Sequence, residues 1–182
     1  MPISTNFNLN MYENTYPTKR FNLTLAFLKK HIQKNESILD LGVENPFSKI
    51  MKQEGFMVSN TKGEDLDVNQ AALKTPFEVV TAFEIFEHLL NPFTVLNEIK
   101  ANKILISVPL RLWFSSAYKS KTDPWDRHFH EFEDWQLDWL LEKTGWHIKD
   151  RIKFTHPTKK IGFRPLLRLF TNRYYLVYAE RS

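Results

Sequence analysis

The sequence predicts an α/β fold in which short helices alternate with the strands of a mainly parallel sheet. Short apolar runs recur at residues 37–42, 56–59, 77–83 and 103–109. Apolar runs bounded by turn residues are typical of buried parallel strands. A helical segment separates the first run from the second, and another separates the third from the fourth. This alternation favours right-handed βαβ units.

The length and composition of the chain predict one globular domain spanning residues 1–182. Hydrophobic residues make up 42% of the sequence, which is enough for a sizeable core. Because there is no cysteine, disulfides, thiolate zinc sites and cysteine nucleophiles are excluded. No apolar run is long enough to cross a membrane, and the N-terminal residues lack the pattern of a signal peptide. We therefore expect a cytoplasmic protein.

Helices are predicted at 17–34, 46–54, 91–100 and 132–144. Pro17 suits a first helical turn, and Asn91 followed by a proline is typical of a helix start. The helix at 132–144 ends before a glycine. Its apolar face is predicted to contain Phe132, Trp135, Trp139 and Leu140.

The remaining segments divide into strands and irregular regions. Two further strands are expected at 146–154 and 174–179. Residues 1–16 are polar and predict a loose arm, whereas 110–131 have no clean period and predict a loop or lid. An insertion of basic and apolar residues, 156–173, precedes the last strand.

Ligands of doubly wound folds bind at the carboxyl ends of the central strands. Three loops are expected to converge there: the loops that follow Gly42, Phe83 and Pro109. A glycine at the end of the first strand lets backbone approach a ligand closely, and a helix N-terminus can hold a carboxylate.

The order of four segments resembles the class I methyltransferases that use S-adenosylmethionine (SAM). These are SILDLG, FEVVTAFEIFEHLLNPFTVLNEIK, KILISVP and HFHEFEDWQLDWLLEKTGWHI, and the match runs from about residue 36 to residue 154. The resemblance implies a Rossmann-like, seven-stranded, mostly parallel sheet with helices on both faces and an antiparallel last strand. It also implies an enzyme that transfers the methyl group of SAM, its cofactor, to an acceptor.

The resemblance assigns the cofactor site residue by residue. Asp40 and Gly42 match the first motif, and Asn60 stands where the family binds the ribose hydroxyls. The expected cofactor-binding residues are Asp40, Gly42, Asn60, Asp65, Leu66, Phe83 and Glu84.

The chain departs from the family pattern in three places. Glu44 replaces a glycine of the cofactor loop and brings a negative charge to it. Asn60 replaces an acidic residue, so it would bind a hydroxyl without charge assistance. Between the second strand and Phe77 the chain is too short for a full helix-strand-helix unit, so this region must be trimmed.

A carboxylate and imidazole cluster is predicted after the third strand. If a helix begins there, Glu84, Glu87 and His88 share one face, and His128 and His130 of the lid complete the set. The pattern also resembles the metal site of Hen1-type RNA 2′-O-methyltransferases. Three roles stay open: positioning of the substrate, general base catalysis, and metal binding. Glu84 is alternatively a helix cap.

The expected reaction is methyl transfer to a small-molecule acceptor, at oxygen. Its catalytic residues would be His88 as the leading base candidate, Glu87 and His128, with no metal. Metal-assisted methylation of RNA is the alternative within this class, although nucleic acid is not the favoured partner. A methyltransferase fold that binds a ligand without catalysis is the alternative outside it. An NAD-binding domain is disfavoured because no G-x-G-x-x-G follows the first strand.

Two surfaces are candidates for contact with other molecules. Lid aromatics either stack on a planar acceptor or cover the sheet; they are Trp113, Phe114, Tyr118, Trp125 and Phe129. The basic and apolar segment 159–173 either lies on an anionic membrane or lipid, or packs on the domain as a helix.

Overall fold

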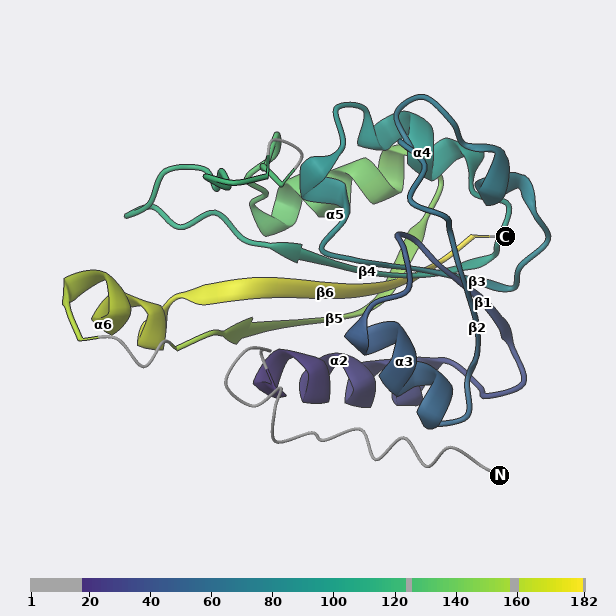
Figure 1. Cartoon of the computed structure of the whole chain (residues 1–182), viewed down its shortest axis with the longest axis horizontal. Coiled ribbons are helices and arrows are strands. Elements are labelled where there is room, and N and C mark those ends of the chain that lie inside the picture. Colours follow the sequence, from purple (N-terminus) through teal and green to yellow (C-terminus); the bar gives the residue numbers. More distant parts are fainter. Residues whose placement is uncertain (1–17, 124–125, 158–160, 182) are drawn as a thin grey trace.

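A computed structural model of the chain describes residues 18–123, 126–157 and 161–181 (Figure 1). The predicted arm 1–16, Pro17 and Trp125 lie outside these residues. Within the described part, one sheet contains six strands in the order β2-β1-β3-β4-β6-β5. The strands are β1 (Ser37–Asp40), β2 (Met57–Asn60), β3 (Val79–Phe83), β4 (Lys103–Pro109), β5 (His147–Thr155) and β6 (Asn172–Glu180).

The predicted sheet of seven strands is wrong for the described residues, which form six. The strand is missing because only a short 3-10 helix, η1 (Ala71–Lys74), lies between β2 and β3. β2, β1, β3 and β4 run parallel, whereas β6 is antiparallel to both β4 and β5. The antiparallel last strand is therefore confirmed. Because Pro109 pairs with Tyr174, β6 begins beside the carboxyl end of β4.

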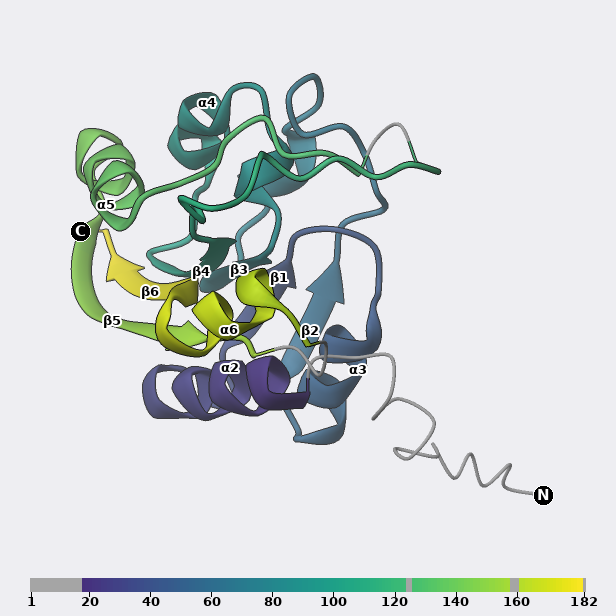
Figure 2. The same cartoon turned by 90° about the vertical axis from the view of Figure 1, so that its left-hand side faces the viewer.

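Helices cover both faces of the sheet, which confirms the predicted α/β class (Figures 1 and 2). The helices are α2 (Thr18–His31), α3 (Pro46–Gln53), α4 (Pro92–Glu98), α5 (Asp134–Lys143) and α6 (Phe163–Phe170). α2 and α3 lie on one face, and α4 and α5 lie on the other. Each face carries its own apolar cluster, with Phe27, Leu28 and Met51 on the first and Leu96, Leu137 and Leu141 on the second.

Asparagine caps begin two of the helices, the predicted one at Asn91 and another at Asn45. The side chain of Asn91 accepts a hydrogen bond from the backbone nitrogen of Thr94, which satisfies a free amide at the start of α4. The side chain of Asn45 accepts from the amides of Phe47 and Ser48 in the first turn of α3. Both helices therefore begin at a fixed residue directly after a loop at the carboxyl ends of the parallel strands. This side of the sheet is called the strand-end edge below.

The four residues predicted on one face of the helix after the lid line one cavity, but this face is not the buried face of α5. Leu137 and Leu141 are the buried residues of α5, whereas Trp135 and Trp139 are 56% and 57% exposed. The structure shows why, because α5 begins at Asp134 and Phe132 is buried in the segment before it. The exposed tryptophans are therefore available to line a surface cavity.

The two irregular regions differ in their contacts. The described residues of 110–131 form no helix or strand beyond two isolated bridges, as predicted for a loop. The insertion forms α6, which has no buried residue and lies beyond the ends of β5 and β6 (Figure 1). Among the described residues, no helix is long and apolar enough to cross a membrane.

Candidate active site

Asp40 is the buried centre of the strand-end edge. Its carboxylate accepts hydrogen bonds from Ser48 at 2.6 Å, from Thr81 at 2.7 Å and from the Asn60 amide at 3.0 Å. Burial raises the pKa of Asp40, and the hydrogen bonds from Ser48, Thr81 and Asn60 oppose that rise. Asp40 therefore joins β1 to β3, to α3 and to β2, and it fixes the loop after β1 by holding these elements together.

Gly42 makes the turn that follows β1. Its φ of +98° lies in the region that disfavours side chains, and its amide donates to Thr61 Oγ1 at 2.7 Å. A Cβ atom at this position would lie 3.4 Å from Ile85 Cδ1. The negative charge that Glu44 brings to this loop is directed away from it, because Glu44 is exposed and forms an ion pair with Lys52 of α3.

Asn60, Asp65 and Leu66, three further residues predicted to bind the cofactor, have different surroundings. Asn60 turns inward to Asp40, and its Oδ1 atom is buried with no hydrogen-bond partner among the described residues. Leu66 belongs to the hydrophobic core. Asp65 is exposed, and its carboxylate accepts a hydrogen bond from the backbone of Asp67. Of the three, Asn60 alone lies beside the cofactor loop in these contacts.

A small pocket of about 190 Å³ lies at the carboxyl ends of β3 and β4. Its lining includes Arg20, Asn45, Phe47, Phe83, Glu84 and Ser107. Arg20 Nη1 lies 3.0 Å from Glu84 Oε2, and Ser107 Oγ donates to Glu84 Oε1 at 2.7 Å. Burial raises the pKa of Glu84, and the positive charge of Arg20 opposes that rise. The pocket therefore holds one cationic and one anionic group side by side.

The predicted helix through Glu84, Glu87 and His88 is wrong. Glu84 has a φ of +57°, and only a short 3-10 helix, η2 (Phe86–His88), follows it. The turn sends Glu84 toward Ser107 and Arg20, whereas Glu87 and His88 lie with His128. The predicted cluster is thus divided into two sites with different neighbours.

Glu87, His88 and His128 form the second site. Each offers one ligand atom, and these atoms lie within 4.8 Å of one another. Glu87 Oε1 is 3.8 Å from His88 Nε2, and the rings of His88 and His128 meet edge to face at 5.1 Å. The Glu87 side chain is 1% exposed and its Oε2 atom has no described hydrogen-bond partner. Burial, then the charge of Glu84, raises the pKa of Glu87 well above its usual range.

Hydrogen bonds orient the two imidazoles. His88 Nδ1 lies 2.9 Å from the carbonyl oxygen of Arg127, and a carbonyl can only accept, so Nδ1 carries the proton. His128 Nδ1 lies 2.8 Å from Glu131 Oε1. Burial lowers the pKa of His128, although the hydrogen bond that its ring donates to Glu131 opposes this shift. The Nε2 atoms of both rings are the atoms left for a proton, a substrate or a cation.

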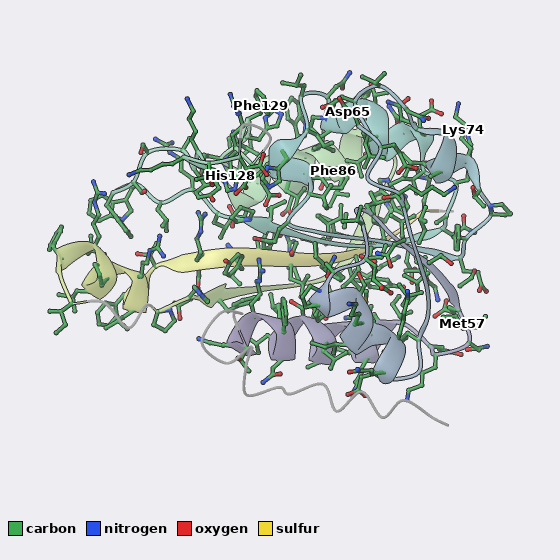
Figure 3. The ribbon with its side chains drawn as sticks, in the orientation of Figure 1. Met57, Asp65, Lys74, Phe86, His128 and Phe129 are labelled. Atoms are coloured by element: carbon green, nitrogen blue, oxygen red, sulfur yellow. The ribbon has the colours of Figure 1, made fainter. Side chains whose placement is uncertain are left out.

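The lid is attached to this site through its backbone. The carbonyl oxygen of Glu87 accepts hydrogen bonds from the amides of Phe129 at 2.8 Å and His130 at 3.2 Å. Figure 3 shows His128 and Phe129 on the face of the sheet that carries α4 and α5. His130 is not part of the cluster that Glu87, His88 and His128 form.

A larger cavity, of about 720 Å³, lies between α4, the end of the lid and α5. Its walls are mainly aromatic and include Phe93, Phe129, Phe132, Trp135 and Trp139. Phe129 is thus the lid aromatic that the structure places against a cavity. Trp113 is 71% exposed, so it does not cover the sheet.

Sequence reasoning missed Arg20, Ser107 and Glu131. Arg20 belongs to the first helix, outside every motif that carries the resemblance. The only signal for it in the sequence is a positive charge near the start of that helix. Ser107 lies in the fifth-strand motif, but its hydroxyl was not singled out. Glu131 follows His128 by three residues in the lid. Outside a helix or strand, this spacing does not predict that the two side chains meet.

The fold defined by this sheet order and these strand-end loops is that of the class I SAM-dependent methyltransferases. The chain matches no protein-family profile and no curated protein. It does match solved structures, 240 chains in all, and these include many methyltransferases of this class.

Two solved methyltransferases illustrate the similarity. The 1,6-didemethyltoxoflavin-N1-methyltransferase of Burkholderia thailandensis, solved with 1,6-didemethyltoxoflavin and S-adenosylhomocysteine, has a TM-score of 0.63 and 14% identity, covering 95% of this chain and 86% of that one. The methyltransferase domain of a bacterial Hen1 has a TM-score of 0.54 and 16% identity, covering 90% and 98%.

The same fold also occurs in a protein described as a cyclase. SpnF has a TM-score of 0.57 and 12% identity, covering 88% of this chain and 81% of that one. At identities this low the similarity establishes the shared fold, and the chemistry has to be argued from the site.

Proposed function

We propose that this chain is a SAM-dependent methyltransferase that acts on a small-molecule acceptor, at oxygen. The observation that carries the proposal is the pair of sites at one strand-end edge: the pocket of Arg20 and Glu84, and the cluster of Glu87, His88 and His128. The first offers groups for a cofactor, and the second offers groups for an acceptor and its proton.

The small pocket fits the amino-acid end of SAM. That end carries an ammonium and a carboxylate, which Glu84 and Arg20 complement in charge. Next to it, the buried Oδ1 of Asn60 is a free acceptor for a ribose hydroxyl. Because Glu44 pairs with Lys52 instead, no carboxylate from the loop opposes the carboxylate of the ligand.

Methyl transfer to a hydroxyl group requires the protein to position the acceptor and to provide one proton acceptor. When bound, SAM supplies a methyl group already activated by its sulfonium. In the neutral imidazole with its proton on Nδ1, Nε2 of His88 can accept the proton of a hydroxyl group as the acceptor oxygen attacks. Glu87 would orient His88, and His128, whose ring meets that of His88 edge to face, would help to position the same imidazole.

Calorimetric titration with SAM and with S-adenosylhomocysteine tests the first step. Binding is expected to raise the melting temperature, because a ligand of the native state stabilises it. Arg20→Gln should weaken binding on the order of 10-fold, since it removes a charged hydrogen bond. Lys34→Gln, at an exposed position, is the matched control and should bind normally. Absence of binding at millimolar SAM would refute the proposal, and binding without transfer would favour a ligand-binding protein.

A second candidate function is methylation assisted by a divalent cation. The structure favours it through the convergence of Glu87, His88 and His128, whose donors of one carboxylate and two imidazoles suit a divalent metal. The unpartnered Oε2 of Glu87 fits the same interpretation, because a cation would keep this buried carboxylate ionised. A bound metal would supply Lewis acidity near the acceptor oxygen.

Direct binding of Mn²⁺, followed by electron paramagnetic resonance, separates the two candidates. Metal binding should be lost in Glu87→Gln and in His128→Gln, and kept in His147→Gln, which alters an exposed histidine. Glu87→Gln should still fold, because burial already favours the neutral acid. Failure of the wild-type chain to bind Mn²⁺ would exclude the metal-assisted function and leave SAM binding untouched.

A further inference from the structure

α6 makes little contact with the described part of the chain, and what it makes is mainly with β5. None of its residues is buried. Phe163 is 71% exposed and Phe170 is 79% exposed, and Leu166 and Leu169 are about half exposed at 54% and 46%. Large apolar side chains gathered on one exposed element mark a site of contact with another apolar phase or partner.

The residues of α6 are divided between two faces. Phe163, Leu166, Leu167 and Phe170 follow the spacing i, i+3, i+4, i+7, so they share one face. Arg164 and Arg168 are four residues apart and share another. Neither arginine has an ion pair or a side-chain hydrogen bond with any described residue. The helix thus presents an apolar face beside two arginines that pair with none of the described residues.

The surrounding sequence carries one sign of charge. Between Asp150 and Glu180 there is no acidic residue, although arginines and lysines are frequent. Arg151, Lys153 and Arg173 are paired with acidic residues of other segments, whereas the two arginines of α6 are not. A protein partner would require acidic groups around an apolar groove, but an anionic bilayer offers both features over any extended surface.

We propose that α6 binds the surface of an anionic lipid bilayer. Phe163, Leu166 and Phe170 would enter the boundary between headgroups and acyl chains, and Arg164 and Arg168 would contact the phosphates. The helix would lie in the plane of the interface and not cross it. This inference does not depend on methyl transfer, and it assigns a partner to a segment that neither strand-end site uses.

The position of α6 explains why this contact would matter to the strand-end sites. α6 is followed directly by β6, whose first residues pair with the last residues of β4. Arg173 in this stretch donates to the carbonyl oxygen of Leu110 at 2.7 Å, at the start of the lid. Figures 1 and 2 show α6 beyond the same end of the sheet as the lid. A docked α6 would therefore hold the strand-end edge near the bilayer, where amphiphilic acceptors reside.

Vesicle flotation tests the proposal with the full chain. One set of vesicles contains phosphatidylcholine alone, and the other also contains phosphatidylglycerol. The chain should float with the anionic vesicles and remain free with the neutral ones, and added salt should weaken binding. Arg164→Gln combined with Arg168→Gln should weaken binding on the order of 10-fold. Phe163→Ser combined with Phe170→Ser should do the same through lost apolar burial.

Matched variants keep the test specific to α6. Lys34→Gln with Lys62→Gln removes two exposed cations elsewhere, and Phe93→Ser removes an exposed aromatic residue of α4. These variants should float like the wild-type chain, and all variants should keep its melting temperature. Equal flotation with both vesicle types, or unchanged flotation of the α6 variants, overturns the proposal. Preferential capture by single-stranded RNA through Arg164 and Arg168 overturns it in favour of a nucleic acid.

Discussion

The Asn60 amide nitrogen lies 3.0 Å from Oδ2 of Asp40, so the last side chain of β2 is bonded to the last side chain of β1. The same nitrogen lies 3.0 Å from Ser48 Oγ and 3.4 Å from the carbonyl oxygen of Gly42. The two N–H groups of the amide can donate to acceptors in this set, whereas an ionised carboxylate has no hydrogen to donate. Asn60 is thus a hydrogen-bond donor to a buried aspartate, a role that an ionised carboxylate at this position could not fill.

Asn60→Asp is expected to destabilise the fold by about 1–3 kcal/mol, because it leaves acceptors facing a second buried carboxylate. The loss should be larger at pH 7, where both carboxyl groups tend to ionise, than near pH 4. Urea denaturation at the two pH values measures it. Asn60→Ser, which keeps a donor, is the control and should lose less. Equal stability of Asn60→Asp and wild type would show that the Asn60–Asp40 bond is not formed in solution.

Gly42→Ala is expected to cost about 1–2 kcal/mol, because its φ of +98° disfavours a side chain and the new Cβ would press on Ile85. SAM affinity should fall with it if the cofactor lies on this turn. Denaturation midpoints and calorimetric titration measure the two effects separately. Gly145→Ala provides the comparison: its φ is +81°, but no atom lies within 4 Å of the added Cβ. It should lose stability and keep SAM affinity.

The elements of the fold could be predicted from the sequence because they depend on local patterns. The apolar runs of β1, β3 and β4 and the Asn91 cap of α4 each carry their own signal within a few residues. The number of strands followed the general pattern of the family instead, and it was wrong because the chain between Asn60 and Val79 is too short. The shortness of this stretch predicts a trimmed region, and in the described residues the trimmed part includes a strand.

The candidate site could be predicted only in part, because its geometry depends on one backbone angle. Periodicity places Glu84, Glu87 and His88 on one face, but the positive φ of Glu84 separates the first from the other two. Long-range contacts then decide the result: Arg20 and Ser107 hold Glu84, and His128 joins Glu87. No spacing within residues 84–88 contains that information.

Asp150→Asn is expected to make stability less dependent on pH in the acidic range. Asp150 accepts from Lys30 and His31 of α2, both at 2.7 Å, and the Lys30 hydrogen bond, then that of His31, lowers the pKa of Asp150. A lowered pKa adds stability above the ordinary value of 3.8, and this stability is lost as pH falls through the folded-state pKa. The variant should be weaker by about 0.5–1 kcal/mol at pH 7. Thermal melts from pH 2 to pH 7 should show the two curves converging at the acidic end.

His88→Gln is expected to reduce kcat by roughly 10²- to 10⁴-fold once an acceptor is found, the range that a general base contributes. Glutamine can still donate to the Arg127 carbonyl oxygen, so the lid should stay attached, and SAM affinity should not change because His88 is not a lining residue of the Arg20–Glu84 pocket. The pH profile identifies the base. Since burial lowers the pKa of His128, activity that depends on His128 would rise with pH at a midpoint below 6.5. Loss of this rise in His128→Gln, with normal kcat in His88→Gln, would transfer the role of base from His88 to His128.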